Sequence, residues 1–201
     1  MAERISRALL PDNTSVADDG MAIFGGVRTD DLVTQFGTPL FVYDEDHIRK
    51  RCQEAVKAFP DGVSYASKAF LCKAIAKLVH EEGMGLDVAT IGEAYIALQS
   101  GVPASDLTLH GNNKSMEELR YAVDNGIGKV VIDSFDEIDK IEHLYATTRK
   151  PIKALVRVTP GVEAYTHKYV TTGQVDSKFG FTVQNGQAGT AIERAKSSGA
   201  I

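Results

Sequence analysis

The feature that most constrains the fold is a strand–helix pair that repeats along the chain at nearly constant length. Short apolar stretches rich in β-branched residues begin near residues 63, 85, 107, 129 and 152, a spacing of roughly 22 residues. Each stretch is followed by a segment with apolar residues at helical spacing, and in the fifth unit a long loop rich in glycine and threonine comes before that segment. Strict alternation at this length predicts parallel strands joined by helical crossovers, and we count five such units.

The same repeat favours one of two parallel α/β architectures. An open sheet that binds a dinucleotide carries a G-x-G-x-x-G motif after its first strand, and no such motif follows the first strand here. Evenly sized units are typical of a (β/α)8 barrel. We therefore expect residues 44–201 to form an incomplete (β/α)8 barrel, with about five of its eight strands.

Residues 1–43 show a different pattern, with weak periodicity and several turn formers. They contain a short helix at 31–36, ended by Gly37, and a stretch of strong β-formers at 39–43 that predicts a strand. We interpret residues 1–43 as an arm and a strand that pack against something outside the barrel.

Helix starts are marked by capping residues. Asp44 precedes a helical pattern, and a last helix is expected over about 187–198. Three further starts have Ser or Thr followed three residues later by Glu, the capping-box pattern, at 90–93, 115–118 and 134–137.

Composition limits the class of function. The formal net charge is −5 without a basic stripe, which argues against a nucleic-acid surface. No apolar run approaches the roughly 20 residues that span a bilayer, and we see no leader segment at the N-terminus, so we expect a cytoplasmic protein. Cys52 and Cys72 form no C-x-x-C pair, and we expect both to be reduced.

Lys68 ends the first repeat, in the stretch Val63-Ser64-Tyr65-Ala66-Ser67-Lys68-Ala69-Phe70. Lysine is rarely buried unless it is paired or used. A lysine amine in a dry pocket loses basicity and can bond to the carbonyl group of a cofactor. Taken alone, this stretch favours the alternative, in which Lys68 starts the next helix and faces water.

The ends of the other strands shift that balance. In a parallel α/β protein, chemistry occurs where strands end and helices begin. Here these positions hold Lys68, Asp87, His110, Asn112, Asn113, Asp133 and Arg157. Convergence of an amine, acids, an imidazole and a guanidinium on one rim favours a functional Lys68.

Each of the other rim residues keeps a structural interpretation. Asp87 could cap a turn, Asp133 could precede a helix start, and His110 could be a satisfied rim histidine. Arg157 lies among core residues of a predicted strand at 152–158, so it should point into the barrel and need an anion or a carboxylate there. The motifs H-E-x-x-H, G-x-S-x-G, G-x-x-x-x-G-K-[ST] and C-x-x-C are all missing, so we expect no metal.

Six blocks in order resemble the fold-type III, pyridoxal-phosphate-dependent decarboxylases. They are Thr38-Pro39-Leu40-Phe41-Val42-Tyr43, Tyr65-Ala66-Ser67-Lys68-Ala69-Phe70, Gly85-Leu86-Asp87-Val88-Ala89 with Gly92-Glu93, His110-Gly111-Asn112-Asn113-Lys114-Ser115, Val156-Arg157-Val158-Thr159-Pro160-Gly161-Val162, and Asp176-Ser177-Lys178-Phe179-Gly180. The fourth block, and the Thr-His and Thr-Gly pairs before the sixth, are similar to the branch of the family that acts on diaminopimelate.

The resemblance implies an alanine racemase-like barrel with pyridoxal 5′-phosphate (PLP) bound to Lys68, and with Asp87, Glu93, His110 and Arg157 around the cofactor. It implies decarboxylation of meso-2,6-diaminopimelate to L-lysine and carbon dioxide, by a homodimer when full length. It also implies a C-terminal β-domain that the arm joins.

The family's phosphate loop and substrate-reading residues come later in the chain than Ile201, so we expect these 201 residues alone to be inactive. A racemase, a basic amino-acid decarboxylase and a non-catalytic PLP carrier are the alternatives.

Overall fold

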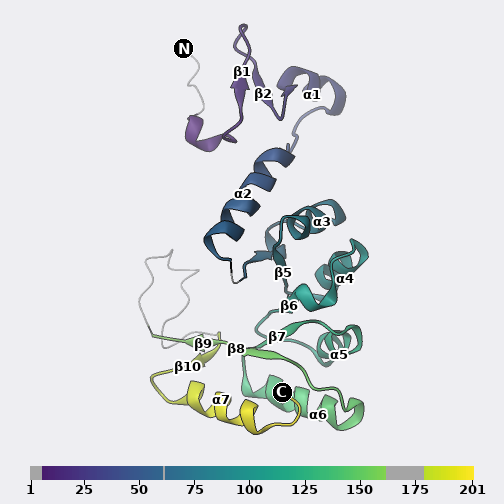
Figure 1. Ribbon diagram of the computed structural model, residues 1–201, viewed down its shortest axis with the longest axis vertical. Helices are drawn as coiled ribbons and strands as arrows, with labels where there is room; N and C mark the ends of the chain where they lie inside the picture. Colours follow the sequence, from purple (N-terminus) through teal and green to yellow (C-terminus); the bar gives the residue numbers. More distant parts are fainter. Residues whose placement is uncertain (1–5, 61, 162–178) are drawn as a thin grey trace. The chain divides into compact units, whose positions relative to one another are not determined.

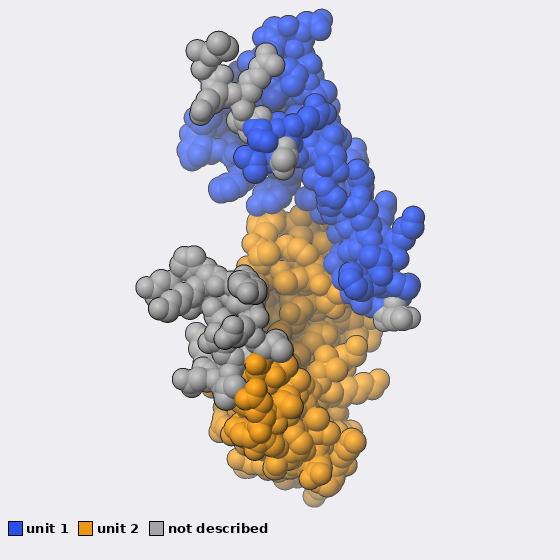
Figure 2. Space-filling model, turned by 90° about the vertical axis from the view of Figure 1, so that its left-hand side faces the viewer, with its two compact units in different colours: residues 1–63, 82–84 blue, residues 64–81, 85–201 orange. Residues whose placement is uncertain are grey.

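A computed structural model describes residues 6–60, 62–161 and 179–201. The chain divides into two compact units, residues 1–63 with 82–84 and residues 64–81 with 85–201 (Figure 2). This division differs from the expected boundary at residue 43, because helix α2 (Glu45–Ala58) is grouped with the N-terminal residues. That residues 1–43 join a further β-domain stays a prediction.

The first unit begins with the short 3-10 helix η1 (Arg7–Leu9) and contains a small antiparallel sheet that the sequence did not predict. Strands β1 (Ser15–Val16), β2 (Ala22–Phe24) and β3 (Val27–Arg28) pair in that order. Gly25 and Gly26 form the two-residue loop between β2 and β3, with φ values of +55° and +81°. Hairpin loops with two left-handed residues favour glycine because it has no Cβ. The strands are too short to show a sequence period.

Both helix predictions for this unit are confirmed. Helix α1 (Thr29–Phe36) ends at Gly37, whose φ of +76° suits a glycine. Helix α2 starts at Asp44, whose carboxylate accepts the backbone N–H of His47 at 3.0 Å. The helix buries Cys52, whereas Cys72 in the second unit is half-buried, and both are free thiols.

The predicted strand at 39–43 is wrong. These residues belong to no sheet of the described segments, and Phe41 is 86% exposed. The reason is that β-forming residues become a strand only when a neighbouring strand supplies the hydrogen-bond ladder. No described segment pairs with this stretch.

The second unit is a five-stranded parallel sheet in the order β4-β5-β6-β7-β8, as the sequence predicted. Its strands are β4 (Ser64–Ala66), β5 (Gly85–Val88), β6 (Leu107–Leu109), β7 (Lys129–Ile132) and β8 (Ala154–Val156). The helices that follow the first four strands are α3 (Lys73–Glu81), α4 (Ile91–Gln99), α5 (Met116–Asn125) and α6 (Phe135–Thr148), arranged along one side of the sheet (Figure 1). The short 3-10 helices are η2 (Ser67–Ala69) and η3 (Ala104–Asp106).

Burial alternates along the strands of this sheet. In β5 Leu86 and Val88 are fully buried, whereas Asp87 between them is only half-buried. In β6 Leu107 and Leu109 are likewise buried. Because successive side chains point to opposite faces, one face packs on the helices and the other carries Asp87.

The fifth strand departs from its prediction at Arg157. The expected strand 152–158 is split into β8 and β9 (Val158–Thr159), and β9 pairs in parallel with β10 (Phe181–Thr182). The backbone N–H of Arg157 donates to the Ile132 carbonyl in β7. The backbone carbonyl of Arg157 accepts the Phe181 N–H, and both hydrogen bonds are 2.9 Å long. Arg157 therefore links the two sheets.

Helix α7 (Gln187–Ser197) is the last helix of the structure, and its bounds agree with the helix predicted over about 187–198. Strand β10 was not predicted, because its two residues follow a stretch rich in glycine and threonine. Phe181 of β10 is held by an edge-on ring contact with Phe135 of α6, at 4.8 Å between centroids. Among the described helices, none is both long and apolar enough to cross a membrane.

Candidate cofactor site

Lys68 lies at the expected edge of the sheet but in a different local structure. Strand β4 ends at Ala66, and Lys68 belongs to the 3-10 turn η2, with helix α3 starting only at Lys73. The Tyr65 hydroxyl donates to the Phe70 carbonyl at 2.7 Å across this turn. The Lys68 side chain is exposed, so the described residues do not provide the expected dry pocket.

Asp87 and His110 are brought together by the parallel register. Asp87 lies opposite Thr108 in the parallel pair of strands. His110 follows β6, and its backbone N–H donates to the Val88 carbonyl at 2.8 Å. The Nδ1 atom of His110 lies 3.2 Å from Oδ2 of Asp87. A carboxylate can only accept, so Nδ1 carries the proton and Nε2 points away from the pair.

Three polar atoms at this edge are buried and have no hydrogen-bond partner within the described segments: Oγ of Ser67, Oδ1 of Asp87 and Nε2 of His110. Buried polar groups are nearly always paired, by protein, water or ligand. Ser67 directly follows β4, Asp87 lies near the end of β5, and His110 directly follows β6, so the three atoms belong to three consecutive strands of the sheet. This edge therefore has hydrogen-bonding capacity for a polar ligand.

Asp133 and Arg157 form a second pair on the same rim. Oδ2 of Asp133 accepts Nη1 of Arg157 at 2.9 Å, and Oδ1 accepts the Gly180 N–H at 2.6 Å. The Arg157 guanidinium also lies 4.5 Å from the centroid of the Phe179 ring. Its side chain is 28% exposed and that of Asp133 only 2%. Arg157 was expected to need an anion or a carboxylate, and the Asp133 carboxylate is its partner; that it points into the barrel stays a prediction.

Gly180 shows why the sixth sequence block ends in glycine. Its φ is +70°, and a Cβ there would lie 2.9 Å from the Arg157 carbonyl oxygen. Only glycine adopts this positive φ without strain and has no Cβ to clash with the Arg157 carbonyl oxygen. The residues Asp176-Ser177-Lys178 of that block, the Thr-His and Thr-Gly pairs before it and Val162 of the fifth block lie outside the described residues.

The three capping sequences all start helices, but their glutamates differ in use. Ser115 and Glu118 form a reciprocal capping box, at 3.1 and 2.8 Å. Glu93 instead reaches one residue further back and accepts the Ala89 N–H at 2.6 Å, while Thr90 accepts the Glu93 N–H. Glu93, implied by the resemblance as a residue near the cofactor, thus fixes the backbone just after β5.

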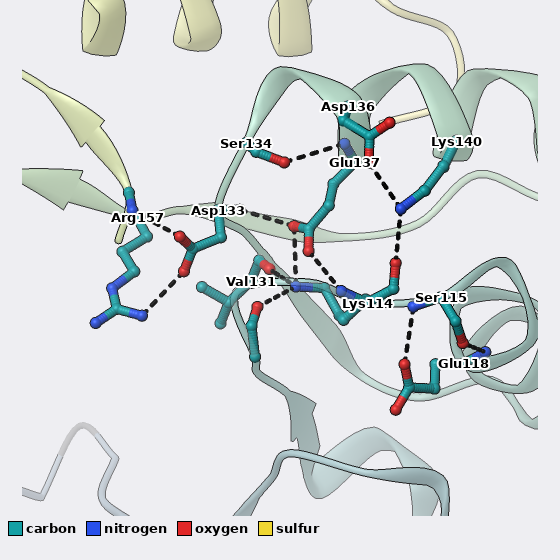
Figure 3. A network of polar contacts seen from close by, with 12 residues as sticks. Lys114, Ser115, Glu118, Val131, Asp133, Ser134, Asp136, Glu137, Lys140 and Arg157 are labelled. Carbon is teal, nitrogen blue, oxygen red and sulfur yellow. Dashed lines mark hydrogen bonds and ion pairs between the residues drawn. The ribbon is translucent and has the colours of Figure 1, made fainter. Parts of the chain in front are cut away.

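Glu137, in the third capping sequence, joins a buried network that the sequence did not predict (Figure 3). Its carboxylate accepts the Asp133 N–H at 2.8 Å and lies 2.9 Å from Nζ of Lys114. The side chains of Lys114 and Glu137 are each 1% exposed. Burial lowers the pKa of Lys114, against the opposing effect of Glu137. The signal available in the sequence was a capping glutamate four residues after the aspartate that follows β7.

The family model for the pyridoxal binding domain of pyridoxal-dependent decarboxylases matches residues 45–200. This chain belongs to that family. A diaminopimelate decarboxylase of Bacillus subtilis is 49% identical over 179 residues, which cover 87% of this chain and 41% of the relative. One of Mycobacterium bovis is 44% identical over 186 residues, which cover 92% of this chain and 42% of the relative. The chain thus spans about two fifths of the length of these decarboxylases.

Solved structures of the family share the fold. Diaminopimelate decarboxylase of M. jannaschii in complex with L-lysine superposes with a TM-score of 0.82 at 31% identity, covering 93% of this chain and 45% of that one. The enzyme of Helicobacter pylori with L-lysine gives 0.73 at 28% identity, covering 82% and 41%. The expected α/β fold, part of a (β/α)8 barrel, is confirmed.

The residues at the strand ends fit pyridoxal phosphate. The cofactor brings a carbonyl for an amine, hydrogen-bonding ring substituents and an anionic phosphate. The rim offers the accessible amine of Lys68, three buried atoms without a partner within the described segments, and the guanidinium of Arg157. Among the described residues, no group of three or more His, Cys, Asp or Glu is placed to hold a metal ion.

Proposed function

We propose that this chain carries the PLP site of an enzyme that decarboxylates meso-2,6-diaminopimelate to L-lysine and carbon dioxide. The observation that carries the proposal is the row of unpartnered buried atoms on Ser67, Asp87 and His110, beside Lys68. The names of the relatives support the substrate. Because the chain spans only about two fifths of their length, the activity of the whole enzyme is part of the proposal.

Each rim residue has a role in this proposal. Lys68 would hold the cofactor through a bond from Nζ to its carbonyl carbon and, after the substrate amine replaces it there, would hold on Nζ the proton that returns to the substrate. Asp87 fixes the proton of His110 on Nδ1, which leaves Nε2 for the ligand. Arg157, held by Asp133, supplies positive charge. When bound, PLP provides the electron sink that allows the substrate carboxyl group to leave as carbon dioxide.

The setting is also part of the proposal. We propose a cytoplasmic homodimer that acts on a small amino acid, with no nucleic-acid or membrane partner. The net charge of −5 supports the first exclusion, and the resemblance supports the dimer. Residues 1–43 are proposed to pack on a β-domain, which is consistent with the exposure of Phe41.

Borohydride reduction after incubation with PLP tests the site. Peptide mass spectrometry should find the reduced cofactor on Lys68. The internal controls are Lys73 and Lys77, also exposed, and Lys114, which is buried. Equal labelling of Lys68, Lys73 and Lys77 would show that PLP reacts with any exposed lysine, and it would overturn the assignment of Lys68. Release of carbon dioxide and L-lysine from meso-diaminopimelate by the full-length enzyme then tests the reaction.

A further inference from the structure

We propose that Lys114 and Glu137 form a buried clamp that positions Asp133 and, through it, Arg157. They are positioning residues, since neither contributes one of the unpartnered buried atoms on Ser67, Asp87 and His110 that we propose bind the ligand. The catalytic meaning of the clamp rests on the proposed function, whereas its structural effect does not.

Glu137 uses both carboxylate oxygens on the backbone at the strand ends. Oε1 accepts the Lys114 N–H at 3.0 Å, and Oε2 accepts the Asp133 N–H at 2.8 Å. These two N–H groups belong to the turn after β6 and to the residue directly after β7. One side chain from the first turn of α6 thus sets the spacing of two neighbouring strand ends (Figure 3).

Lys114 completes the clamp with its three ammonium hydrogens. Nζ donates to the carbonyl oxygens of Gly111 and Val131 at 2.7 and 2.6 Å, and it lies 2.9 Å from Oε2 of Glu137. An ammonium group has three donors, so every one is used. This arrangement joins the turn after β6, strand β7 and helix α6.

Asp133 transmits this geometry to the rim. Glu137 holds its backbone N–H, and its carboxylate holds Arg157 on one oxygen and the Gly180 N–H on the other. A short aspartate side chain places its carboxylate within the small range that its backbone allows. Displacement of the Asp133 backbone therefore displaces the partner of Arg157.

Stability alone does not account for the pair. A buried ion pair is expensive to desolvate, and apolar side chains of similar volume often stabilise a fold equally well. What apolar side chains cannot supply is an acceptor for the Asp133 N–H and a donor to the Val131 carbonyl. Within the described residues, the hydrogen bonds of the next capping glutamate, Glu118, to a helix start go to its own capping residue, Ser115.

The test compares Lys114→Met/Glu137→Leu with the two single variants in the 201-residue chain. Each single variant leaves a buried charge unpaired and should lower the unfolding temperature more than the double variant does. The control is Arg194→Met/Glu142→Leu, which removes the ion pairs of Arg194 in α7 with Asp139 and Glu142 in α6, away from the strand ends.

Two measurements separate positioning from stability. The first is hydrogen exchange of the Gly180 amide without cofactor, which should become about tenfold faster in the double variant and not in the control. The second is PLP affinity, which should fall by about fivefold. In an Arg157→Met background the double variant should cause no further fall, because both changes act through the same pair.

Unchanged Gly180 exchange in the folded double variant would overturn the clamp, and so would an equal loss of PLP affinity in the Arg157→Met background. If the double variant does not fold, Glu137→Gln, which keeps the shape of the side chain, is judged by the same Gly180 criterion. If the unmodified chain is not labelled on Lys68, the proposed function fails, and Gly180 exchange still decides on the clamp.

Discussion

Nδ1 of His110 lies 3.2 Å from Oδ2 of Asp87, although 23 residues separate them in the chain. The pair exists because β5 and β6 are parallel neighbours, with Asp87 opposite Thr108 and His110 two residues further on. Both remaining polar atoms, Oδ1 and Nε2, are buried without a partner in the described part of the chain. The pair is therefore oriented by its own contact and keeps two polar atoms with unused hydrogen-bonding capacity.

Asp87→Ala tests this orientation. Without the carboxylate, the proton of His110 is no longer fixed on Nδ1, and one buried acceptor for the ligand is lost. We expect PLP affinity to fall by about tenfold. Absorbance titration measures the affinity, and Asp124→Ala, on the exposed surface of α5, is the control. Equal affinities of the two variants would exclude a role for the pair.

Arg157→Leu removes the partner of a carboxylate that is only 2% exposed. Asp133 would keep the Gly180 N–H but lose its counter-charge, so we expect a loss of about 1–3 kcal/mol in the free energy of unfolding. PLP affinity should fall as well. Arg120→Leu, on the exposed surface of α5, should change the free energy of unfolding by less than about 0.5 kcal/mol. Denaturant unfolding of both variants checks this, and similar losses would contradict it.

Gly180→Ala should be harmful for a backbone reason. The φ of +70° is strained for alanine, and the new Cβ would meet the Arg157 carbonyl oxygen at 2.9 Å. We expect a loss of about 1–3 kcal/mol, measured by denaturant unfolding. Gly189→Ala in α7 is the matched control, since nothing lies within 4 Å of its added Cβ, and it should stabilise the chain by about 0.5–1 kcal/mol. The prediction fails if both variants behave alike.

The sequence predicted the parts of the fold that follow from periodicity. The strands near 85, 107 and 129 were found close to their starts, because each is followed by a helix with a clear capping residue. The strand order followed from the alternation of elements. Rim residues such as Asp87 and Asp133 could be named because the ends of parallel strands meet at one edge.

What the sequence did not predict depends on contacts between distant residues. Strand β10 exists because Phe181 pairs with Val158, and Arg157 divides a predicted strand because its backbone bonds to two sheets. Glu137 looked like a local cap, whereas its carboxylate bonds to Lys114, 23 residues earlier. The stretch at 39–43 failed in the opposite way, since its residues favour a strand but join no sheet of the described segments.

Acid stability of the first unit provides a prediction that is independent of the cofactor. Nη1 of Arg49 donates to Glu82 at 2.7 Å, and Nε2 of Gln53 donates to its other oxygen at 2.8 Å. These bonds, the one from Arg49 most strongly, lower the pKa of Glu82 below its ordinary value of 4.5. A carboxyl whose pKa is lower in the folded state contributes stability above its unfolded pKa, and this contribution is lost as pH falls through the folded value.

Glu82→Gln should therefore be less stable than the unmodified chain at neutral pH. The difference should stay constant down to about pH 4.5 and shrink below it, because Glu82 then becomes protonated in the unfolded state first and in the folded state only at lower pH. Denaturant midpoints between about pH 7 and pH 3 measure this, with Glu117→Gln on the exposed surface of α5 as the control. A difference that persists unchanged at about pH 3 would show that Glu82 acts through its shape and hydrogen bonds and not through its charge.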